Sequence, residues 1–360
     1  MNAAPALSIT AALRAPNDLL PFALSQWDAL IRDARRANLL SRLARGIEDH
    51  GLLRYIPAAP RAHLQSALVI AQAQTHAVQR EVAYIRKALA HVDVDIVLLK
   101  GAAYLEVGLP AAHGRVFSDV DILVPFARLA EVEAALLLHG WATTHHDPYD
   151  QHYYRTWMHE LPPLRHNVRR TVLDVHHAIL PRTARLKPDS AKLIASSQPI
   201  AGNDRLRVLC PTDMVLHCAT HLFHNEELSH GLRDLADLDS LLRHFGQAPE
   251  FWTTLRQRTA ELDLGRPLYY GLRYASRLLG TPLPPHALHA ADADRPPRFV
   301  GRVMDAVYGQ SLPPVASAEV GYRAAMARHA IYVRAHWLRM PPLMVVRHLT
   351  VKALRRRADP

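Results

Sequence analysis

Hydrophobic side chains recur at helical spacing along the first quarter of the chain. Trp27 and Leu30 begin one such pattern, and a longer one covers residues 63–90. Residues three and four positions apart share one face of an α-helix, so each pattern predicts a helix with one buried face. Pro57 and Pro60 separate the two predicted helices, because proline disfavours a helix interior.

The pattern changes at residue 92, where short runs of continuous apolar residues replace the helical spacing. The first run is rich in β-branched residues and ends at Lys100 and Gly101, which is typical of a buried strand followed by a tight turn. The elements predicted for this central part are strands at 94–99, 118–124 and 171–176 and helices at 102–107 and 126–139.

From Pro211 onward the helical spacing returns. The predicted helices cover 213–224, 232–245, 252–262 and 268–279, and the proline-rich stretch at 281–298 predicts a loop or linker. We therefore expect an α+β fold in which a small mixed β-sheet core lies between two helical flanks. The predicted divisions are an N-terminal helical region at 1–91, the core at 92–200 and a C-terminal helical domain at 201–360.

The composition of the 360-residue chain is that of a globular protein, with 49% hydrophobic and 21% charged residues. Its formal net charge of +10 suits an anionic partner, such as a nucleotide, a nucleic acid or an acidic membrane surface. A solvated, arginine-rich surface accounts for the charge equally well. Arginine is spread along most of the chain, so no single nucleic-acid-binding stripe stands out.

The sequence favours a cytoplasmic location. Its two cysteines, Cys210 and Cys218, are too few for a disulfide framework or a four-thiolate zinc site. The N-terminus lacks the charged and then apolar pattern of a signal peptide, and no run of about 18 apolar residues predicts a membrane span.

Residues 119–124 carry the most informative chemistry of the chain. Side chains alternate between the two faces of a strand, so Asp119 and Asp121 project together while Val120 and Ile122 pack into the core. Two carboxylates held this close repel each other, and a divalent cation offsets the repulsion best. An exposed strand edge with two solvated acids is the alternative interpretation.

Two stretches of the central part resemble motifs of a known superfamily. Residues 97–101 read VLLKG and residues 114–124 read GRVFSDVDILV, and both resemble the nucleotidyltransferase superfamily, whose best-known member is DNA polymerase beta. Together with LDVHHAI at 173–179, they are more closely similar to the bacterial family of uncharacterised nucleotidyltransferases. The likeness covers most of the chain but is dense only around 94–124 and 172–180.

The resemblance implies a short mixed sheet with helices, a nucleoside triphosphate substrate and two Mg²⁺ ions. Asp119 and Asp121 match the metal ligands of the superfamily, and Gly101 matches the glycine that lets the triphosphate approach the backbone. One residue departs from the pattern: Ala102 stands where the superfamily usually has Ser or Gly to hold a phosphate.

Residues around these motifs are predicted to contact the nucleotide. Lys100 and Arg115 are expected to stabilise the charge of the triphosphate, and either could replace the phosphate contact that Ala102 lacks. The predicted nucleotide contacts are Lys100, Gly101, Arg115, Ser118 and His221.

Asp174 is predicted to be a third metal ligand and the catalytic base. On the strand at 171–176 it shares a face with His176. The resemblance implies a third carboxylate on a neighbouring strand that completes the metal site and draws the proton from the attacking hydroxyl. The alternative is an ion pair of Asp174 with Arg169 or Arg170 at a strand edge.

Several histidines near these motifs are ambiguous. His176 and His177 are either structural or ligands, and the His159–Glu160 pair is a weak candidate for substrate contact from a loop.

Three histidines, His217, His221 and His224, share one face of the helix predicted at 213–224. The spacing could bind zinc, but a structural role is favoured because no HExxH motif is present. This helix is expected to face the active-site cleft and to bring His221 to the nucleotide.

Two further patterns have simple interpretations. Arg233 and Asp237 lie four residues apart on the next helix, which predicts an ion pair within that helix. Residues 343–357 combine an apolar face with basic residues, which suits either a helix on an anionic membrane surface or a docked terminal helix. The docked helix is the favoured interpretation.

Together these patterns favour a metal-dependent nucleotidyltransferase that moves a nucleotidyl group from a nucleoside triphosphate to an unknown hydroxyl or phosphate acceptor. The alternative is a catalytically degenerate nucleotide- or partner-binding module on the same fold, which Ala102 favours. A nucleic-acid-binding protein is a third hypothesis, and only the basic charge supports it.

Overall fold

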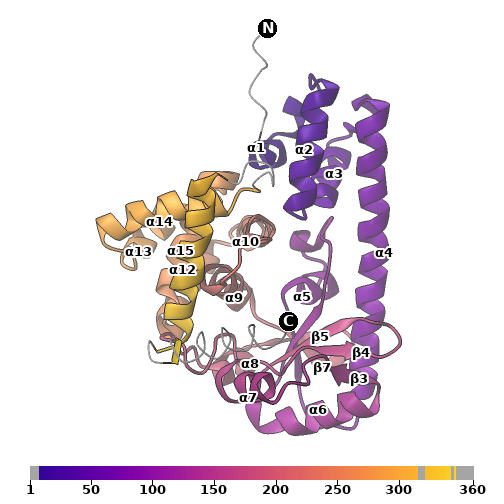
Figure 1. Ribbon diagram of the computed structural model, residues 1–360, viewed down its shortest axis with the longest axis vertical. Helices are drawn as coiled ribbons and strands as arrows, with labels where there is room; N and C mark the ends of the chain where they lie inside the picture. The colour runs from indigo at the N-terminus through magenta and orange to yellow at the C-terminus, as the bar shows by residue number, and fades with distance from the viewer. Residues whose placement is uncertain (1–7, 315–320, 342–343, 346–360) are drawn as a thin grey trace, which may run out of the picture.

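The computed structural model describes residues 8–314, 321–341 and 344–345 and has the expected α+β architecture (Figure 1). A mixed seven-stranded sheet lies in the middle of the chain, with helices before and after it. In Figure 1 the N-terminal helices stand at the top, the sheet lies at the lower right and the C-terminal helices lie at the left. The predicted fold class is confirmed.

The N-terminal region is a group of helices in which the long helix α4 forms one edge of the molecule (Figure 1). Trp27 and Leu30 are buried, as their spacing predicted. Pro57 is the N-terminal cap of α4, and Pro60 lies in its first turn, where the missing backbone N–H has no partner to lose. The helices are α1 (Ile9–Arg14), α2 (Leu24–Arg36), α3 (Leu40–Asp49) and α4 (Ala58–Ala88).

The sheet has the strand order β3-β4-β5-β2-β1-β7-β6. Its strands are β1 (Ile96–Leu99), β2 (Val120–Leu123), β3 (Trp141–Thr143), β4 (Leu164–His166), β5 (Val172–His176), β6 (Gln198–Ile200) and β7 (Asn203–Val208). The central strand β2 is antiparallel to β1 and parallel to β5. The three strands that the sequence predicts are therefore three neighbours at the centre of the sheet.

Four strands were not predicted from the sequence. β3, β4 and β6 have three residues each, which is too short for an alternating pattern to be recognised. β7 does alternate, because Leu206 and Val208 are buried between arginines, and it pairs with β1. The sheet therefore continues past residue 200, the predicted end of the core.

Helices connect the strands and follow the sheet. Those within the sheet region are α5 (Lys100–Glu106), α6 (Leu129–Leu138), α7 (Pro148–Trp157) and α8 (Ser190–Ala195). Those after the sheet are α9 (Pro211–His224), α10 (Gly231–Phe245), α11 (Pro249–Leu262), α12 (Gly265–Tyr274), α13 (Pro285–Asp292), α14 (Arg298–Ser311) and α15 (Tyr322–Arg339). The prediction of a loop at 281–298 was wrong in part, since α13 begins there at a proline, which suits a first helical turn.

A buried ion pair ties the β4–β5 hairpin to α4. Arg169, in the turn between the two strands, donates hydrogen bonds to Glu81 with Nε–Oε2 and Nη2–Oε1 distances of 2.7 and 2.9 Å. The same guanidinium lies over the rings of Tyr84 and Trp141, at 4.2 and 4.9 Å from their centroids. Arg169 thus pairs with Glu81 and not with Asp174, which was the alternative given by the sequence.

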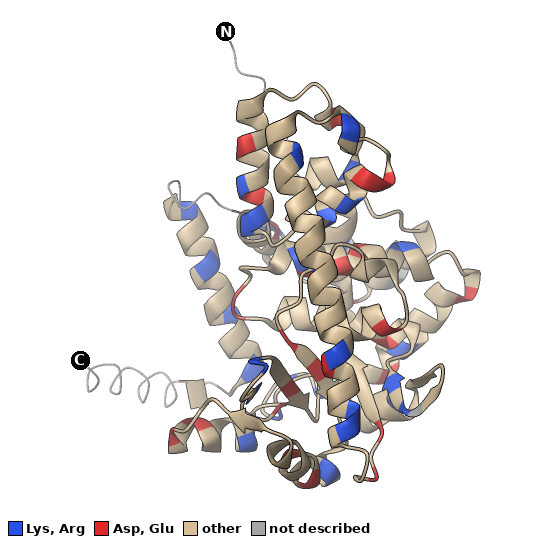
Figure 2. Ribbon diagram, turned by 90° about the vertical axis from the view of Figure 1, so that its right-hand side faces the viewer, with Lys and Arg blue, Asp and Glu red and all other residues tan. Residues whose placement is uncertain are grey.

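Basic and acidic residues are interspersed along the helices and loops (Figure 2). Helix α15 carries four arginines and no acidic residue: Arg323, Arg328, Arg334 and Arg339. In the part of the chain that the structure describes, no helix has the length and apolar character needed to cross a membrane. Apart from Met344 and Val345, the basic segment predicted at 343–357 lies outside the described residues, so its docking stays a prediction.

Candidate functional site

Two aspartates lie side by side on the central parallel strands. β2 and β5 pair in register, with Asp121 opposite Asp174. Side chains of paired residues on neighbouring strands project from the same face of a sheet, so the two carboxylates share a face. Asp119 lies directly before β2, close enough for the charge of Asp121 to act on it.

Asp121 is the centre of a buried network of charged side chains. Its Oδ1 accepts hydrogen bonds from Lys100 Nζ at 2.7 Å and from His176 Nε2 at 3.0 Å, and the residue is only 3% exposed. Burial raises the pKa of Asp121, but Lys100 and His176 outweigh burial and hold that pKa well below its ordinary value of 3.8. Asp121 is therefore a carboxylate at neutral pH.

Lys100 has an uncommon backbone conformation. Its φ of +47° lies in the left-handed region that favours glycine. The residue follows β1 directly and begins α5, and this turn brings its side chain to Asp121 on the next strand. Such strained positions cluster at functional sites, where the surrounding structure maintains them.

Within the part of the chain that the structure describes, no lysine or arginine is bonded to the other two aspartates, Asp119 and Asp174. Burial, followed by the charges of Asp121 and Glu160, raises the pKa of Asp174 to about 8. Among the described residues, the buried Oδ1 of Asp174 has no hydrogen-bond partner. Burial and Asp121 also raise the pKa of Asp119, although Ser118 Oγ donates to it at 3.0 Å. Three carboxylates of which two, Asp119 and Asp174, lack a bonded positive partner in the described ranges fit a hard divalent cation such as Mg²⁺.

The most compact group of possible metal ligands is a different one. In the described ranges, the one group of three such side chains with donor atoms all within 4.8 Å of each other is His159, Glu160 and His176. Glu160 Oε2 lies 3.2 Å from His176 Nδ1 and 3.9 Å from His159 Nε2. The three aspartates are not drawn together to this degree, so their prediction as metal ligands stays a prediction. The sequence ranks His159 and Glu160 as weak candidates, because a two-residue motif in a loop carries little information.

Helix α9 brings two of its three histidines toward the carboxylates. Burial and then Lys100 lower the pKa of His217 to about 3 and that of His221 well below its ordinary value of 6.5. Both rings are therefore neutral at pH 7. His224 faces elsewhere: burial and Arg334 lower its pKa to about 3. The structure does not bring the three α9 histidines together as a metal site.

The space beside Gly101 is filled by Arg115. A Cβ at residue 101 would overlap Arg115 Nη1 and would lie 2.7 Å from its Cζ and 2.9 Å from Phe117 Cδ1. Arg115 is 6% exposed, and its Nε donates to Asp237 Oδ2 at 2.9 Å. The missing side chain of Gly101 thus makes room for a guanidinium, and contact of either residue with a nucleotide stays a prediction.

Asp237 of α10 holds Arg115 in this position through a hydrogen-bonded ion pair. Its Oδ1 accepts a hydrogen bond from Arg42 of α3, and its Oδ2 accepts the one from Arg115. The predicted pairing of Asp237 with Arg233 was wrong, since Arg233 Nη2 instead donates to Asp234 Oδ1 at 2.8 Å. The spacing of Arg233 and Asp237 along one helix cannot indicate that Asp237 pairs with arginines of other segments.

The remaining predicted positions are easily placed. Ser118 is exposed and lines a cavity of about 100 Å³ between α4 and β2, together with Phe117 and Asp119. Ala102 is buried in α5 and offers no side-chain donor for a phosphate.

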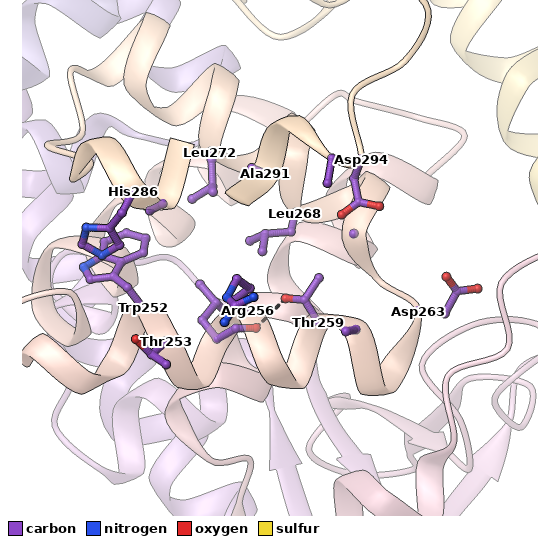
Figure 3. A pocket seen from close by; sticks show the side chains of 15 residues that line it. Trp252, Thr253, Arg256, Thr259, Asp263, Leu268, Leu272, His286, Ala291 and Asp294 are labelled. Carbon is purple, nitrogen blue, oxygen red and sulfur yellow. Dashed lines mark hydrogen bonds between the residues drawn. The ribbon is translucent and has the colours of Figure 1, made fainter. Parts of the chain in front are cut away.

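A larger cavity lies apart from the aspartates, among α11, α12 and α13 (Figure 3). Its volume is about 560 Å³. Trp252, Leu268 and Leu272 line it, and Arg256 and Asp294 are among its charged residues. None of the residues that line this cavity belongs to the network around Asp121.

Comparison with known proteins adds one finding about the family. A family model described as uncharacterised nucleotidyltransferase matches residues 24–280. No curated protein and no solved structure matches the chain. The matched range includes the whole sheet and α9, whereas α13, α14 and α15 lie outside it.

Proposed function

The chain belongs to the family of uncharacterised nucleotidyltransferases, as its motifs indicated, and from this premise we propose that it is a metal-dependent nucleotidyltransferase. It would move a nucleotidyl group from a nucleoside triphosphate to a hydroxyl or phosphate acceptor and release pyrophosphate. The observation that carries the proposal is the register of β2 with β5, which sets Asp121 beside Asp174.

Asp119, Asp121 and Asp174 would hold two Mg²⁺ ions. Such ions, when bound, would offset the negative charge that develops during the transfer. Two observations support this role of the aspartates. The Oδ1 of Asp174 has no donor among the described residues, and the pKa values of Asp119 and Asp174 are raised. A bound cation would give Asp174 Oδ1 a partner and would lower both pKa values.

The other groups of the site would bind and position the substrate. Asp174 would accept the proton of the attacking hydroxyl, because a bound cation would keep its carboxylate ionised and able to serve as a base. Lys100 would add positive charge for the phosphates beside Asp121. His217 and His221, both neutral, would offer hydrogen bonds without adding charge. Positioning and electrostatic stabilisation would thus supply most of the rate increase.

The proposal is tested by nucleotide binding and transfer with the full chain. Isothermal titration calorimetry with ATP, CTP, GTP and UTP is expected to give Mg²⁺-dependent binding of at least one of them. Asp121→Asn is expected to lower transfer of a labelled nucleotide to acceptors in a cell extract by about 100-fold or more. Asp28→Asn is the matched control, because its side chain is 64% exposed on α2. No Mg²⁺-dependent binding of any of the four would contradict the proposal.

A catalytically degenerate binding module is the second candidate. Ala102 supplies no phosphate contact, and Arg115 fills the space beside Gly101. Such a module would bind a nucleotide or another partner without releasing pyrophosphate. Mg²⁺-dependent binding of a triphosphate, with no pyrophosphate formed in any extract, would select this candidate.

A cytoplasmic location is part of the proposal. Cys210 and Cys218 are free thiols, which is usual in a reducing compartment. Nucleic acid and membrane surfaces have weaker support as partners, because basic and acidic residues are interspersed in the described part of the chain (Figure 2).

A further inference from the structure

A second set of ligand side chains lies beside the aspartates and uses none of them. It consists of His159, Glu160 and His176, whose donor atoms all lie within 4.8 Å of one another in the described part of the chain. Glu160 Oε2 is 3.2 Å from His176 Nδ1 and 3.9 Å from His159 Nε2. Donors around a tetrahedral zinc ion at about 2.0–2.1 Å lie about 3.3–3.5 Å apart. The Glu160–His176 pair is therefore close to the separation that a metal ion requires, and His159 Nε2 lies somewhat farther from Glu160 than this.

The hydrogen bond between His176 and Asp121 determines which ring nitrogen of His176 is free. A carboxylate can only accept, so Nε2, which lies 3.0 Å from Asp121 Oδ1, carries the hydrogen. In the neutral ring, Nδ1 then presents a lone pair toward Glu160 Oε2. Two acceptors then face each other unless Nδ1 holds a proton. Burial disfavours that proton, but Glu160 and Asp121 outweigh burial and raise the pKa of His176. Nδ1 makes no hydrogen bond with the described residues although His176 is 3% exposed. A cation between the two atoms would satisfy both.

The surroundings of His176 match those of a metal-bound histidine. Such a histidine usually donates its second ring N–H to a carboxylate or carbonyl, which orients the ring, and Asp121 has this position here. Glu160 is held by a β-bridge to His176, and His159 O accepts from His177 N at 2.8 Å. His159 differs, because its Nδ1 is buried with no hydrogen-bond partner in the described ranges and its ring therefore lacks this second contact. The backbone therefore presents all three side chains from one small, well-connected region.

We propose that His159, Glu160 and His176 bind one transition-metal ion, for which Zn²⁺ is the best fit. Two imidazoles and one carboxylate favour zinc over Mg²⁺, which takes oxygen ligands. Three protein ligands leave a fourth position open, as in zinc sites that bind water or a substrate group. The site does not depend on the proposed nucleotidyl transfer, because its ligands are not the three aspartates.

The test is a titration of the full, chelator-treated chain with Co²⁺, followed by competition with Zn²⁺. One equivalent of Co²⁺ is expected to bind with the intense visible absorption of a four-coordinate ion, and Zn²⁺, but not Mg²⁺, is expected to displace it. Glu160→Gln keeps the shape of the side chain and removes its charge, and His159→Ala removes one ligand. Each is expected to weaken Zn²⁺ binding by about 10- to 100-fold.

Control variants separate this site from others. The chain has 23 histidines, so surface binding is tested with His139→Ala, an exposed residue at the end of α6, which is expected to bind Co²⁺ as the wild type does. Asp119→Asn is expected to lose Mg²⁺-dependent nucleotide binding and to keep the Co²⁺ spectrum, so the two proposals fail separately. The proposal is overturned if the wild type binds no stoichiometric Co²⁺, or if Glu160→Gln and His159→Ala, folded by circular dichroism, bind as the wild type does. A proton would then lie between His176 and Glu160.

Discussion

At the scale of single residues, the site is governed by whether each buried acid has a positive partner. Asp121 is bonded to Lys100, and Asp237 is bonded to Arg115. A buried charge without a partner costs several kcal/mol, so these pairs are what allow the acids to be ionised inside the protein. Asp174 differs, because its buried Oδ1 has no donor among the described residues. A bound cation is therefore expected to stabilise the ionised carboxylate more at Asp174 than at Asp121 or Asp237.

Gly101→Ala tests how tightly Arg115 fills the space beside the turn. The new methyl group would overlap the guanidinium and contact the Phe117 ring, so we expect a loss of about 1–3 kcal/mol in urea unfolding. Gly46→Ala is the matched control, because a methyl group in that turn of α3 meets nothing within 4 Å; it is expected to stabilise by about 0.5–1 kcal/mol. An unchanged stability of Gly101→Ala would mean that Arg115 moves aside easily, which would leave the turn open to a triphosphate.

Asp237→Asn tests the pH dependence of stability. Burial raises the pKa of Asp237, but Arg115 and Arg42 outweigh it and lower the pKa below its ordinary 3.8. A carboxyl with a depressed folded-state pKa stabilises the protein above its unfolded-state pKa, and this contribution is lost as the pH falls through the folded-state value. We expect the variant to lose about 3–5 kcal/mol at pH 7.

The measurement is urea unfolding of both proteins at pH 7 and at the lowest pH at which they stay folded. The difference between them is expected to shrink at the acid end. A difference of the same size at both pH values would mean that Asp237 acts through packing and not through its charge. Asp28→Asn, on the exposed face of α2, is expected to change stability by less than about 0.5 kcal/mol at either pH.

At the scale of elements, α4 supports the sheet from one side of the molecule (Figure 1). Arg169→Ala would leave Glu81, which is 2% exposed, buried without its partner. We expect this variant to lose about 3–5 kcal/mol in urea unfolding. The double variant Glu81→Met/Arg169→Met is expected to be more stable than Arg169→Ala, because it buries no unpaired charge. If the double variant loses more, the packing of Arg169 on Tyr84 and Trp141 outweighs its charge.

At the scale of the whole molecule, helix α15, which lies outside the family match, packs near the site. Helix α15 docks through Arg185, whose backbone N donates to Leu338 O at 2.9 Å and whose Nε donates to Trp337 O at 3.0 Å. The charge of Arg339, at the end of α15, acts on His159 and contributes to its lowered pKa, after burial and His176. The surroundings of the site thus include a segment beyond the matched range of 24–280.

Arg185→Ala tests this docking. The substitution removes one hydrogen bond and the stacking of the guanidinium on Trp337, at 4.2 Å from the ring centroid. A loss of about 1 kcal/mol in local stability corresponds to about fivefold faster amide exchange in residues 330–339, with α4 unchanged. Hydrogen–deuterium exchange with mass spectrometry measures this, and Arg32→Ala on the exposed face of α2 is the control. Equal exchange rates in the variant and the wild type would show that α15 is held by its apolar contacts alone.

The sequence by itself determined the centre of the fold. A continuous apolar run marked β1, because a strand covered on both faces needs apolar residues throughout, and apolar residues that alternate with Asp121 or Asp174 marked β2 and β5. The alternation of side chains on a strand predicted that Asp121 lies on the face opposite Val120 and Ile122, and that Asp174 shares a face with His176. These signals are local, so a short window of sequence contains them completely. The three-residue strands β3, β4 and β6 are too short to produce such a signal.

Only the tertiary structure decided which charged groups meet. Asp237 lies four residues from Arg233, yet it is bonded to Arg42 across 195 positions of sequence. Arg115 is expected from its motif to face a phosphate, yet it lies against Gly101 and Asp237. His159, Glu160 and His176 come together only because the segment with His159 and Glu160 forms a β-bridge to His176 on β5. The energy of such contacts depends on distance and burial in space, and neither quantity is contained in the spacing of residues along the chain.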